Sequence, residues 1–127
     1  MAFEAMLQPI QIGKLTISNL VISTAHAEVY ETDGGMTTDR YVKYYEEKAK
    51  GGIGLAICGG SSVVAIDSPQ EWWSSVNLST DRIIPHFQNL ADAMHKHGAK
   101  IMIQITNMGR RSRWDGFNWP TLMSPSG

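Results

Sequence analysis

Short apolar runs alternate with longer amphipathic stretches along most of the 127 residues. The run Ile53 to Cys58 is too short for a helix and unbroken enough for a strand that is buried on both faces. Gly51 and Gly52 precede it as a helix stop in the left-handed conformation, and the segment 59–62 (GGSS) follows it as an exit where backbone can approach a ligand. This stretch predicts a parallel strand with a ligand at its carboxyl end.

Similar runs lie on both sides of that strand. Ile10 to Ser18 alternates apolar and polar side chains around Gly13-Lys14, which predicts a β-hairpin. Leu20 to Thr24 is rich in β-branched residues and predicts a first buried strand, and Lys100 to Ile105 predicts a third.

Two amphipathic helices are predicted between the strands. The first is capped by Thr37 or Thr38 and ends at Gly51, and the second runs from Thr80 or Asp81 to Gly98. Their apolar positions recur at helical spacing and define the buried faces, which are Tyr41, Val42, Tyr45 and Ala49 in the first helix and Phe87, Leu90, Ala91 and Met94 in the second. Segments 27–36, 63–79 and 112–127 show no helical or strand period and are interpreted as loops.

Strands that alternate with helices indicate an α/β fold with parallel strands and right-handed crossovers. Either a doubly wound sheet or a (β/α)8 TIM barrel fits this order. A complete barrel takes about 250 residues, so residues 1–127 would supply only a leading hairpin, three strands and two helices, truncated after the third barrel strand. Both folds bind ligands at the carboxyl ends of the strands, which directs attention to segments 25–27, 58–62 and 104–110.

The composition, 43% apolar and 18% charged with a net charge of −1, is that of an ordinary globular domain. It gives no broad attraction to nucleic acid or to an anionic membrane, and the basic run Arg110 to Trp114 is weak support for either partner. The single cysteine, Cys58, excludes an intramolecular disulfide, and no apolar run approaches the roughly 18 residues of a membrane span. We therefore expect a cytoplasmic protein that acts on a small molecule.

Three separated segments carry a family resemblance. They are LQPIQIGKLTISNLVIS, DGGMTTDRYVKYYEEKAKGGIGLAICGGSS and DRIIPHFQNLADAMHKHGAKIMIQITNMGRR. In order and spacing they resemble the amino-terminal part of the FMN-dependent flavin oxidoreductases of the old yellow enzyme class. The STAHA and GGSS segments are similar to the trimethylamine dehydrogenase and N-methylproline (stachydrine) demethylase branch. The resemblance implies an FMN-binding (β/α)8 barrel whose bottom is closed by the amino-terminal hairpin.

The resemblance also implies which residues contact the cofactor. Ala25, His26 and Ala27 match the segment after the first strand that touches the flavin ring, although Ala27 lacks the hydroxyl or thiol that the family places there. Gly60 matches a small residue whose backbone approaches the flavin. Gln104 matches a strand glutamine whose amide can both donate to and accept from the pyrimidine edge. Without the resemblance, Gln104 would more often be a core amide bonded to backbone, and Gly60 is equally explained by turn geometry.

Substrate contacts are predicted at Tyr30, Asn107 and Arg110. Asn107 stands where the family commonly has a histidine, and Arg110 follows Gly109 as in the family. Tyr30 belongs to a set of loop aromatic residues that suit a cation–π cage for a methylated ammonium group or, alternatively, simple loop packing, and the others are Trp72, Trp73, Trp114 and Trp119. His26 has no partner at metal-ligand spacing, so we expect no metal site there and leave substrate contact and a structural role open.

The expected function is oxidative demethylation of a methylated amine or imino acid, such as N-methylproline, by hydride transfer to FMN. Reduction of an activated alkene is the alternative within the class, and a non-catalytic α/β assembly module is the alternative outside it. A longer parent protein is expected to hold the catalytic acid or base, the phosphate site, and in this branch an iron–sulfur cluster and a second nucleotide cofactor. The 127 residues alone are expected to be inactive, and either to self-associate or to pair with the rest of the barrel.

Overall fold

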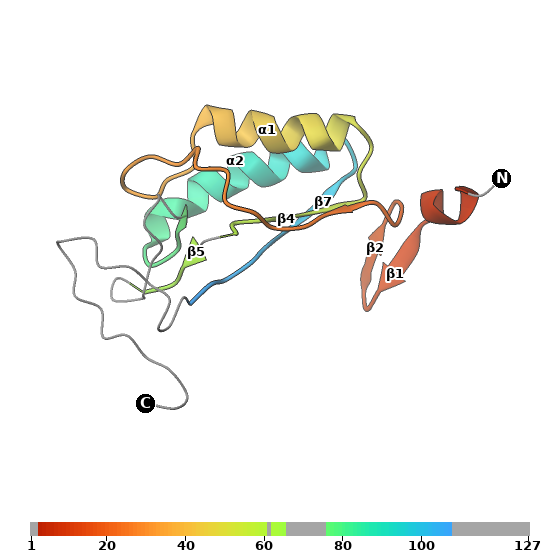
Figure 1. Ribbon diagram of the computed structural model, residues 1–127, viewed down its shortest axis with the longest axis horizontal. Helices are drawn as coiled ribbons and strands as arrows, with labels where there is room; N and C mark the ends of the chain where they lie inside the picture. The colour runs from red at the N-terminus through yellow and green to blue at the C-terminus, as the bar shows by residue number, and fades with distance from the viewer. Residues whose placement is uncertain (1–2, 61, 66–75, 108–127) are drawn as a thin grey trace, which may run out of the picture.

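Three parallel strands form the centre of the computed structural model, which describes residues 3–60, 62–65 and 76–107. The strands are β3 (Ile22–Ser23), β4 (Leu55–Cys58) and β7 (Lys100–Ile103), and they lie side by side in the order β3-β4-β7 (Figure 1). Ala56 pairs with Ser23 on one side and with Ile101 on the other. The three predicted strands therefore exist, run parallel and neighbour one another in chain order, although each is shorter than its apolar run.

Both long helices lie on the same face of this sheet, α1 (Asp39–Lys50) beside α2 (Ile84–His95) (Figure 1). Thr38 caps α1 by accepting the Tyr41 N–H at 3.3 Å. Thr80 caps a short 3-10 helix, η2 (Asp81–Ile83), that leads into α2. Consecutive strands with both crossover helices on one face match the first units of a barrel. Among the described residues, no helix has the length and apolar character that crossing a membrane requires.

The predicted turn at Gly51 and Gly52 needs a correction. Gly52 has the left-handed conformation, with φ of 89°, whereas Gly51 keeps a helical φ of −69°. Gly51 is still the last helical-turn residue, because its N–H donates to the Glu47 carbonyl at 3.0 Å. Only one left-handed residue is therefore needed to turn the chain from α1 toward β4.

The core lies between the helices and the strand face that points toward them. Tyr41, Tyr45, Leu90 and Met94 are fully buried there and pack with the strand residues Ala56 and Cys58. The buried face predicted for α1 is confirmed at all four positions. In α2 it is confirmed at Leu90 and Met94, while Phe87 and Ala91 are only partly buried.

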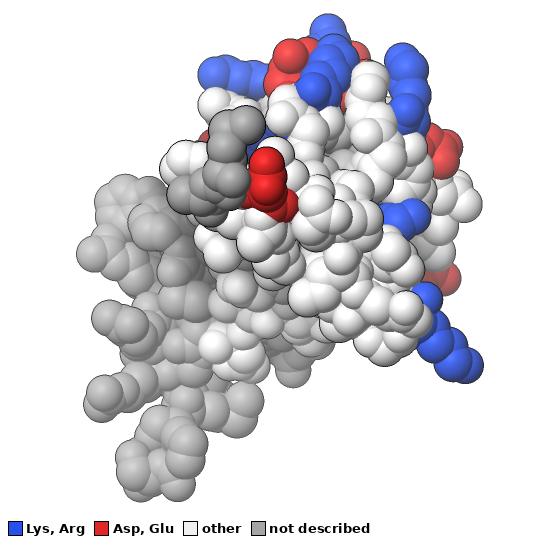
Figure 2. Space-filling view, turned by 90° about the vertical axis from the view of Figure 1, so that its right-hand side faces the viewer, with Lys and Arg blue, Asp and Glu red and all other residues white. Residues whose placement is uncertain are grey.

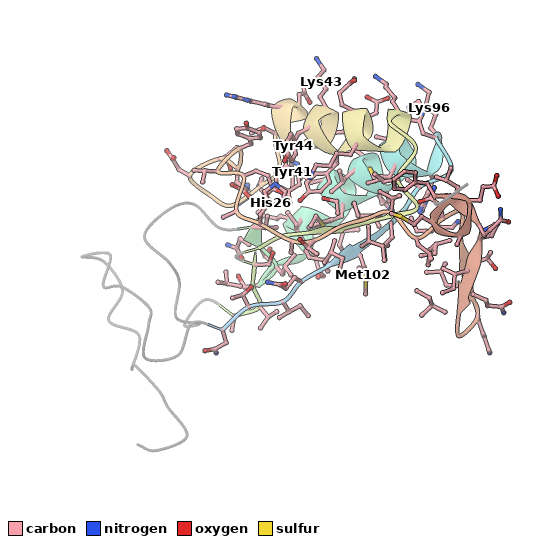
Figure 3. The ribbon with its side chains drawn as sticks, turned by 45° about the vertical axis from the view of Figure 1, so that its right-hand side comes forward. His26, Tyr41, Lys43, Tyr44, Lys96 and Met102 are labelled. Atoms are coloured by element: carbon pink, nitrogen blue, oxygen red, sulfur yellow. The ribbon has the colours of Figure 1, made fainter. Side chains whose placement is uncertain are left out.

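The opposite face of the sheet differs from the prediction of strands buried on both faces. Leu55 in β4 is buried, but Ile22 in β3 is 41% exposed and Met102 in β7 is 52% exposed. These three side chains share one face because Ile22 pairs with Leu55, and Met102 lies two residues beyond the partner of Leu55 in β7. Figure 3 shows Met102 pointing away from both helices. The described residues thus leave apolar side chains uncovered on this side.

The amino-terminal hairpin is confirmed, with β1 (Ile10–Ile12) antiparallel to β2 (Leu15–Ile17) and Gly13 in the turn at φ of 59°. It follows a 3-10 helix, η1 (Glu4–Leu7). Several of its apolar side chains are exposed, among them Ile12 at 51%.

Charged side chains gather over the helices at the top of Figure 2, and the middle of this side is largely uncharged.

A second small sheet corrects the interpretation of segment 63–79 as irregular. β5 (Ser62–Val63) and β6 (Val76–Asn77) form a parallel pair, and Val63 and Val76 are 3% and 0% exposed. Two-residue strands with one apolar side chain each leave no period in the sequence, so pattern alone does not reveal them.

A charged cluster joins α1 to the chain just after α2. The Glu46 carboxylate lies 3.2 Å from His97 Nε2, 3.9 Å from Lys96 Nζ and 4.0 Å from Lys50 Nζ. The hydrogen bond from His97 lowers the pKa of Glu46 below its ordinary value of 4.5, and the two lysines lower it further.

This cluster predicts an acid-dependent loss of stability. A depressed carboxyl pKa stabilises the folded state above the ordinary value of 4.5, and that contribution disappears as the pH falls through the lowered folded-state pKa. We expect His97→Ala to flatten the dependence of unfolding free energy on pH below about 4.5. Urea denaturation across this range measures it, with His95→Ala, at an exposed position in the last turn of α2, as the control. Equal slopes for both variants would contradict the prediction.

Candidate functional site

Hydrogen bonds between the strand exits bring the predicted site segments together. The Gly60 N–H donates to the His26 carbonyl at 3.2 Å, joining the exits of β3 and β4. The Gln104 N–H donates to the Cys58 carbonyl at 2.9 Å, which continues the parallel ladder from β4 to β7. Residues 25–27, Gly60 and Gln104 therefore form one continuous edge at the carboxyl ends of the three strands.

Gly60 has no room for a side chain. A β-carbon there would stand 2.7 Å from the Ala27 nitrogen and closer still to the carbonyl carbon of His26. The sequence suggested that glycine lets a ligand approach, whereas the atoms that fill this space are the backbone of the β3 exit. Glycine is thus required for the exits of β3 and β4 to meet.

Gln104 places an exposed amide just beyond β7. Its Nε2 lies 3.4 Å from the Gly60 carbonyl oxygen, which also accepts from the Thr106 hydroxyl at 3.2 Å. A primary amide carries both a donor and an acceptor, which suits an edge with alternating carbonyl and N–H groups. The Gln104 side chain thus bonds to backbone, as the core-amide interpretation expects, but it is exposed among the described residues and not buried. The role of Thr106 was missed, because its partner lies 46 residues away in the sequence.

His26 connects the β3 exit to α1. Its Nδ1 lies 3.2 Å from the Thr24 carbonyl oxygen, and its Nε2 lies 2.7 Å from the Tyr44 hydroxyl (Figure 3). The imidazole also meets the Tyr44 ring edge to face, with centroids 5.7 Å apart. Its side chain stays 43% exposed, so the ring is anchored on one side and open to a ligand on the other.

Behind this edge lies a buried polar group that the sequence interpretation missed. The Glu28 side chain is 1% exposed and accepts a hydrogen bond from the Tyr45 hydroxyl. Burial raises the pKa of both Tyr41 and Tyr45 above their ordinary value, so both keep their hydroxyl hydrogens at neutral pH. The only signal in the sequence was an acidic residue directly after the segment 25–27.

Cys58 is a buried thiol at the end of β4. Desolvation raises its pKa to about 12, so the thiol stays protonated near neutral pH. It packs in the core and offers no nucleophile, which agrees with its interpretation as a small buried side chain.

The predicted substrate residues are less closely grouped. Tyr30 is partly buried, and the Arg40 guanidinium lies 4.0 Å from its ring centroid, so one face of this ring already holds a cation. Asn107 is exposed beyond the β7 exit. Arg110 and all four tryptophans lie outside the described residues. Within the described ranges no group of three His, Cys, Asp or Glu side chains is arranged to hold a metal ion.

Residues 5–127 match the model of the NADH:flavin oxidoreductase / NADH oxidase family. The chain belongs to this family. Among curated relatives of the flavin oxidoreductases, N,N-dimethylglycine/sarcosine dehydrogenase of Chromohalobacter salexigens is 82% identical over all 127 residues. A probable N-methylproline demethylase of Rhizobium meliloti is 41% identical over 97% of the chain. The chain spans 18% of the length of each of these two proteins.

Solved structures give the fold of this flavin oxidoreductase chain. A 2-naphthoyl-CoA reductase in complex with 2-naphthoyl-CoA superposes with a TM-score of 0.80 and 27% identity, over 87% of the chain and 17% of that protein. The old yellow enzyme from Trypanosoma cruzi superposes with a TM-score of 0.78 and 26% identity, over 88% of the chain and 29% of that enzyme. The predicted partial (β/α)8 barrel and the resemblance to the old yellow enzyme class are confirmed, although the described strands do not close a barrel.

Proposed function

We propose that residues 1–127 form the first part of an FMN-binding barrel domain in an oxidoreductase that demethylates a methylated amino or imino acid. The 82% identity to N,N-dimethylglycine/sarcosine dehydrogenase, which extends over the whole chain, carries this proposal. The 41% identity to a probable N-methylproline demethylase supports the same substrate class. Because the chain spans 18% of these relatives, the complete activity needs residues that lie outside it.

The residues at the strand exits fit the cofactor that the family name implies. Gln104 presents an exposed donor and acceptor pair, as the pyrimidine edge of a flavin requires. Gly60 links the backbone of Ala25 to Ala27 to Gln104. Its N–H donates to the His26 carbonyl, and its own carbonyl accepts from the Gln104 side-chain amide. When bound, FMN supplies the two-electron acceptor for a hydride from an N-methyl carbon.

The chain's own residues bind and orient in this scheme. Gln104 fixes one edge of the flavin, the segment 25–27 supports another, and the exposed side of His26 faces the remaining space. Tyr30, Asn107 and Arg110 remain predicted substrate contacts. The iron–sulfur cluster and the second nucleotide cofactor are proposed only for a longer parent protein, and the single Cys58 is buried and unsuited to hold a cluster.

Alkene reduction is the second candidate. A multifunctional alkene reductase/demethylase of Caballeronia cordobensis is 41% identical over 97% of the chain, so one relative combines both names. Both reactions use the same flavin edge, and the exits of β3, β4 and β7 suit either. The third candidate, a non-catalytic assembly module, predicts a protein that takes up no flavin.

Anaerobic substrate mixing separates these candidates. The complete gene product should be yellow as purified, and N,N-dimethylglycine, sarcosine or N-methylproline should bleach its flavin absorbance under anaerobic conditions. Two results together would favour the reductase. None of the three methylated substrates would bleach the flavin, and an activated alkene would reoxidise enzyme that had been reduced by a nicotinamide. A colourless protein that ignores added FMN would support the assembly module and overturn the proposal.

A further inference from the structure

The Glu28 carboxylate lies directly behind the β3 exit and has an unusual environment. Its side chain is 1% exposed, and Oε1 accepts from the Tyr45 hydroxyl. Its Oε2 is buried and has no hydrogen-bond partner among the described residues. Buried carboxylate oxygens are nearly always paired, because desolvation of an unpaired one is strongly unfavourable. A buried acid in this state needs an explanation beyond packing.

The other neighbour of Glu28 is His26, whose Nε2 lies 3.7 Å from Glu28 Oε1. Because the Thr24 carbonyl can only accept, the contact at Nδ1 assigns a hydrogen to that nitrogen. In the neutral ring, Nε2 then accepts from the Tyr44 hydroxyl at 2.7 Å. In the imidazolium, Nε2 becomes a donor and Glu28 supplies the opposite charge. The direction of hydrogen bonding around the ring thus depends on its protonation.

Further charged and titratable groups lie around this network on α1, on β4 and at Glu31, whose charge acts on Tyr41. From α1, Lys48 lies 4.3 Å from the Tyr44 ring centroid and 4.9 Å from that of Tyr45, and it donates to the Ser23 hydroxyl at 2.9 Å. Tyr41 lies beside Tyr45 with ring centroids 5.1 Å apart. From β4, the protonated Cys58 thiol packs in the same core. Among these groups, Glu28 contacts Tyr45 directly and lies 3.7 Å from His26, so it links the core side of the network to the His26 ring.

The backbone that follows Glu28 is held in an unfavourable conformation. Val29 has φ of 57°, the left-handed region that a β-branched residue rarely adopts. Val29 is 52% exposed, so its own side-chain packing does not enforce this turn. Two hydrogen bonds hold the neighbouring residues in place. The Tyr45 hydroxyl donates to Glu28, and the Gly60 N–H donates to the His26 carbonyl. The segment is thus fixed from the α1 side and from the β4 side at once.

We propose that Glu28 is a positioning residue, which acts through Tyr45 and His26 to fix the orientation of the His26 ring and the place of the backbone 25–27 at the flavin. This inference rests on the proposed function, because it assigns that backbone to the flavin. Neither Glu28 nor Tyr45 reaches the exposed edge, so their effect on the cofactor is transmitted by His26 and by the segment itself.

The test uses the complete gene product, deflavinated and titrated with FMN. Glu28→Gln keeps the shape of the side chain and removes its charge, and Tyr45→Phe removes one hydroxyl. Glu47→Gln is the matched control, because Glu47 is 69% exposed on α1 and pairs with Lys50. We expect Glu28→Gln and Tyr45→Phe each to weaken FMN binding about tenfold, and the double variant to lose less than the sum because the two groups act together.

A second readout separates positioning from simple structural support. The absorbance and circular dichroism spectra of bound FMN depend on the groups that surround the flavin ring, so Glu28→Gln should change these spectra while Glu47→Gln leaves them unchanged. A lower melting temperature of Glu28→Gln, with unchanged FMN affinity and unchanged flavin spectra, would overturn the inference alone. Should that variant fail to fold, Tyr45→Phe decides by the same two criteria. A wild type that takes up no FMN would overturn the proposed function and the inference together.

Discussion

Gly60→Ala should remove most flavin binding from the complete gene product. The added β-carbon would stand 2.7 Å from the Ala27 nitrogen and closer to the His26 carbonyl carbon, so two stretches of backbone must separate. That movement breaks the bond from the Gly60 N–H to the His26 carbonyl and shifts the Gly60 carbonyl away from the Gln104 amide. We expect FMN affinity to fall by tenfold or more and stability by about 1–3 kcal/mol.

Gly34→Ala is the control for this change. Among the described residues, a β-carbon at Gly34 would meet only the Thr32 hydroxyl, at an ordinary contact distance of 3.8 Å. Equilibrium titration with FMN and thermal melting measure both variants. Gly60→Ala protein that binds FMN as tightly as Gly34→Ala protein would show that the exits of β3 and β4 need not touch for the cofactor to bind.

Met102→Glu should reduce self-association of the isolated 127-residue chain but destabilise the complete gene product. Met102 points away from the helices and is 52% exposed on the uncovered face of the sheet (Figure 3). In the isolated 127-residue chain we expect this face to drive self-association, so a charge there should shift sedimentation toward monomer. In the complete product, where we propose that the face turns into the barrel, the same charge would be buried without a partner, at a cost of several kcal/mol.

Ile84→Glu controls for hydrophobicity alone, because Ile84 is 49% exposed at the start of α2, away from the sheet face. We expect it to leave sedimentation of the short chain and FMN retention of the complete product close to wild type. A wild-type 127-residue chain that sediments as a clean monomer and melts cooperatively would contradict the expected association. A complete Met102→Glu product that folds and stays yellow would contradict the barrel placement.

Local sequence pattern predicted the elements that depend on local physics. The helical faces around Tyr45 and Leu90 and the turn at Gly13 follow from spacing within one element, and all are present. The sequence left the cap open between Thr37 and Thr38, and Thr38 is the cap. Parallel order also followed, because short apolar strands joined by helices leave few alternatives. The pattern failed at β5 and β6, whose pairing depends on one buried valine in each strand.

Long-range polar contacts were beyond the reach of sequence pattern. Glu28 looks like an ordinary loop acid until Tyr45, 17 residues later, donates to it. Thr106 looks like a strand-end hydroxyl until its oxygen reaches Gly60. At Gly60 the pattern predicted that glycine is needed so that a ligand can approach the backbone. In the structure, the contact that excludes a side chain is with the backbone of the β3 exit.

The bonds that join the strand exits also bear on how slowly this edge opens. The amides of Gly60, Gln104 and Thr106 donate to carbonyls of neighbouring exits at 3.2, 2.9 and 2.8 Å. Each of these hydrogens exchanges with solvent when its own pair of segments separates, so equal protection at all three would show that the edge opens as one unit. An edge assembled before a ligand arrives loses little conformational entropy on binding, and the ligand's contacts then contribute more fully to affinity.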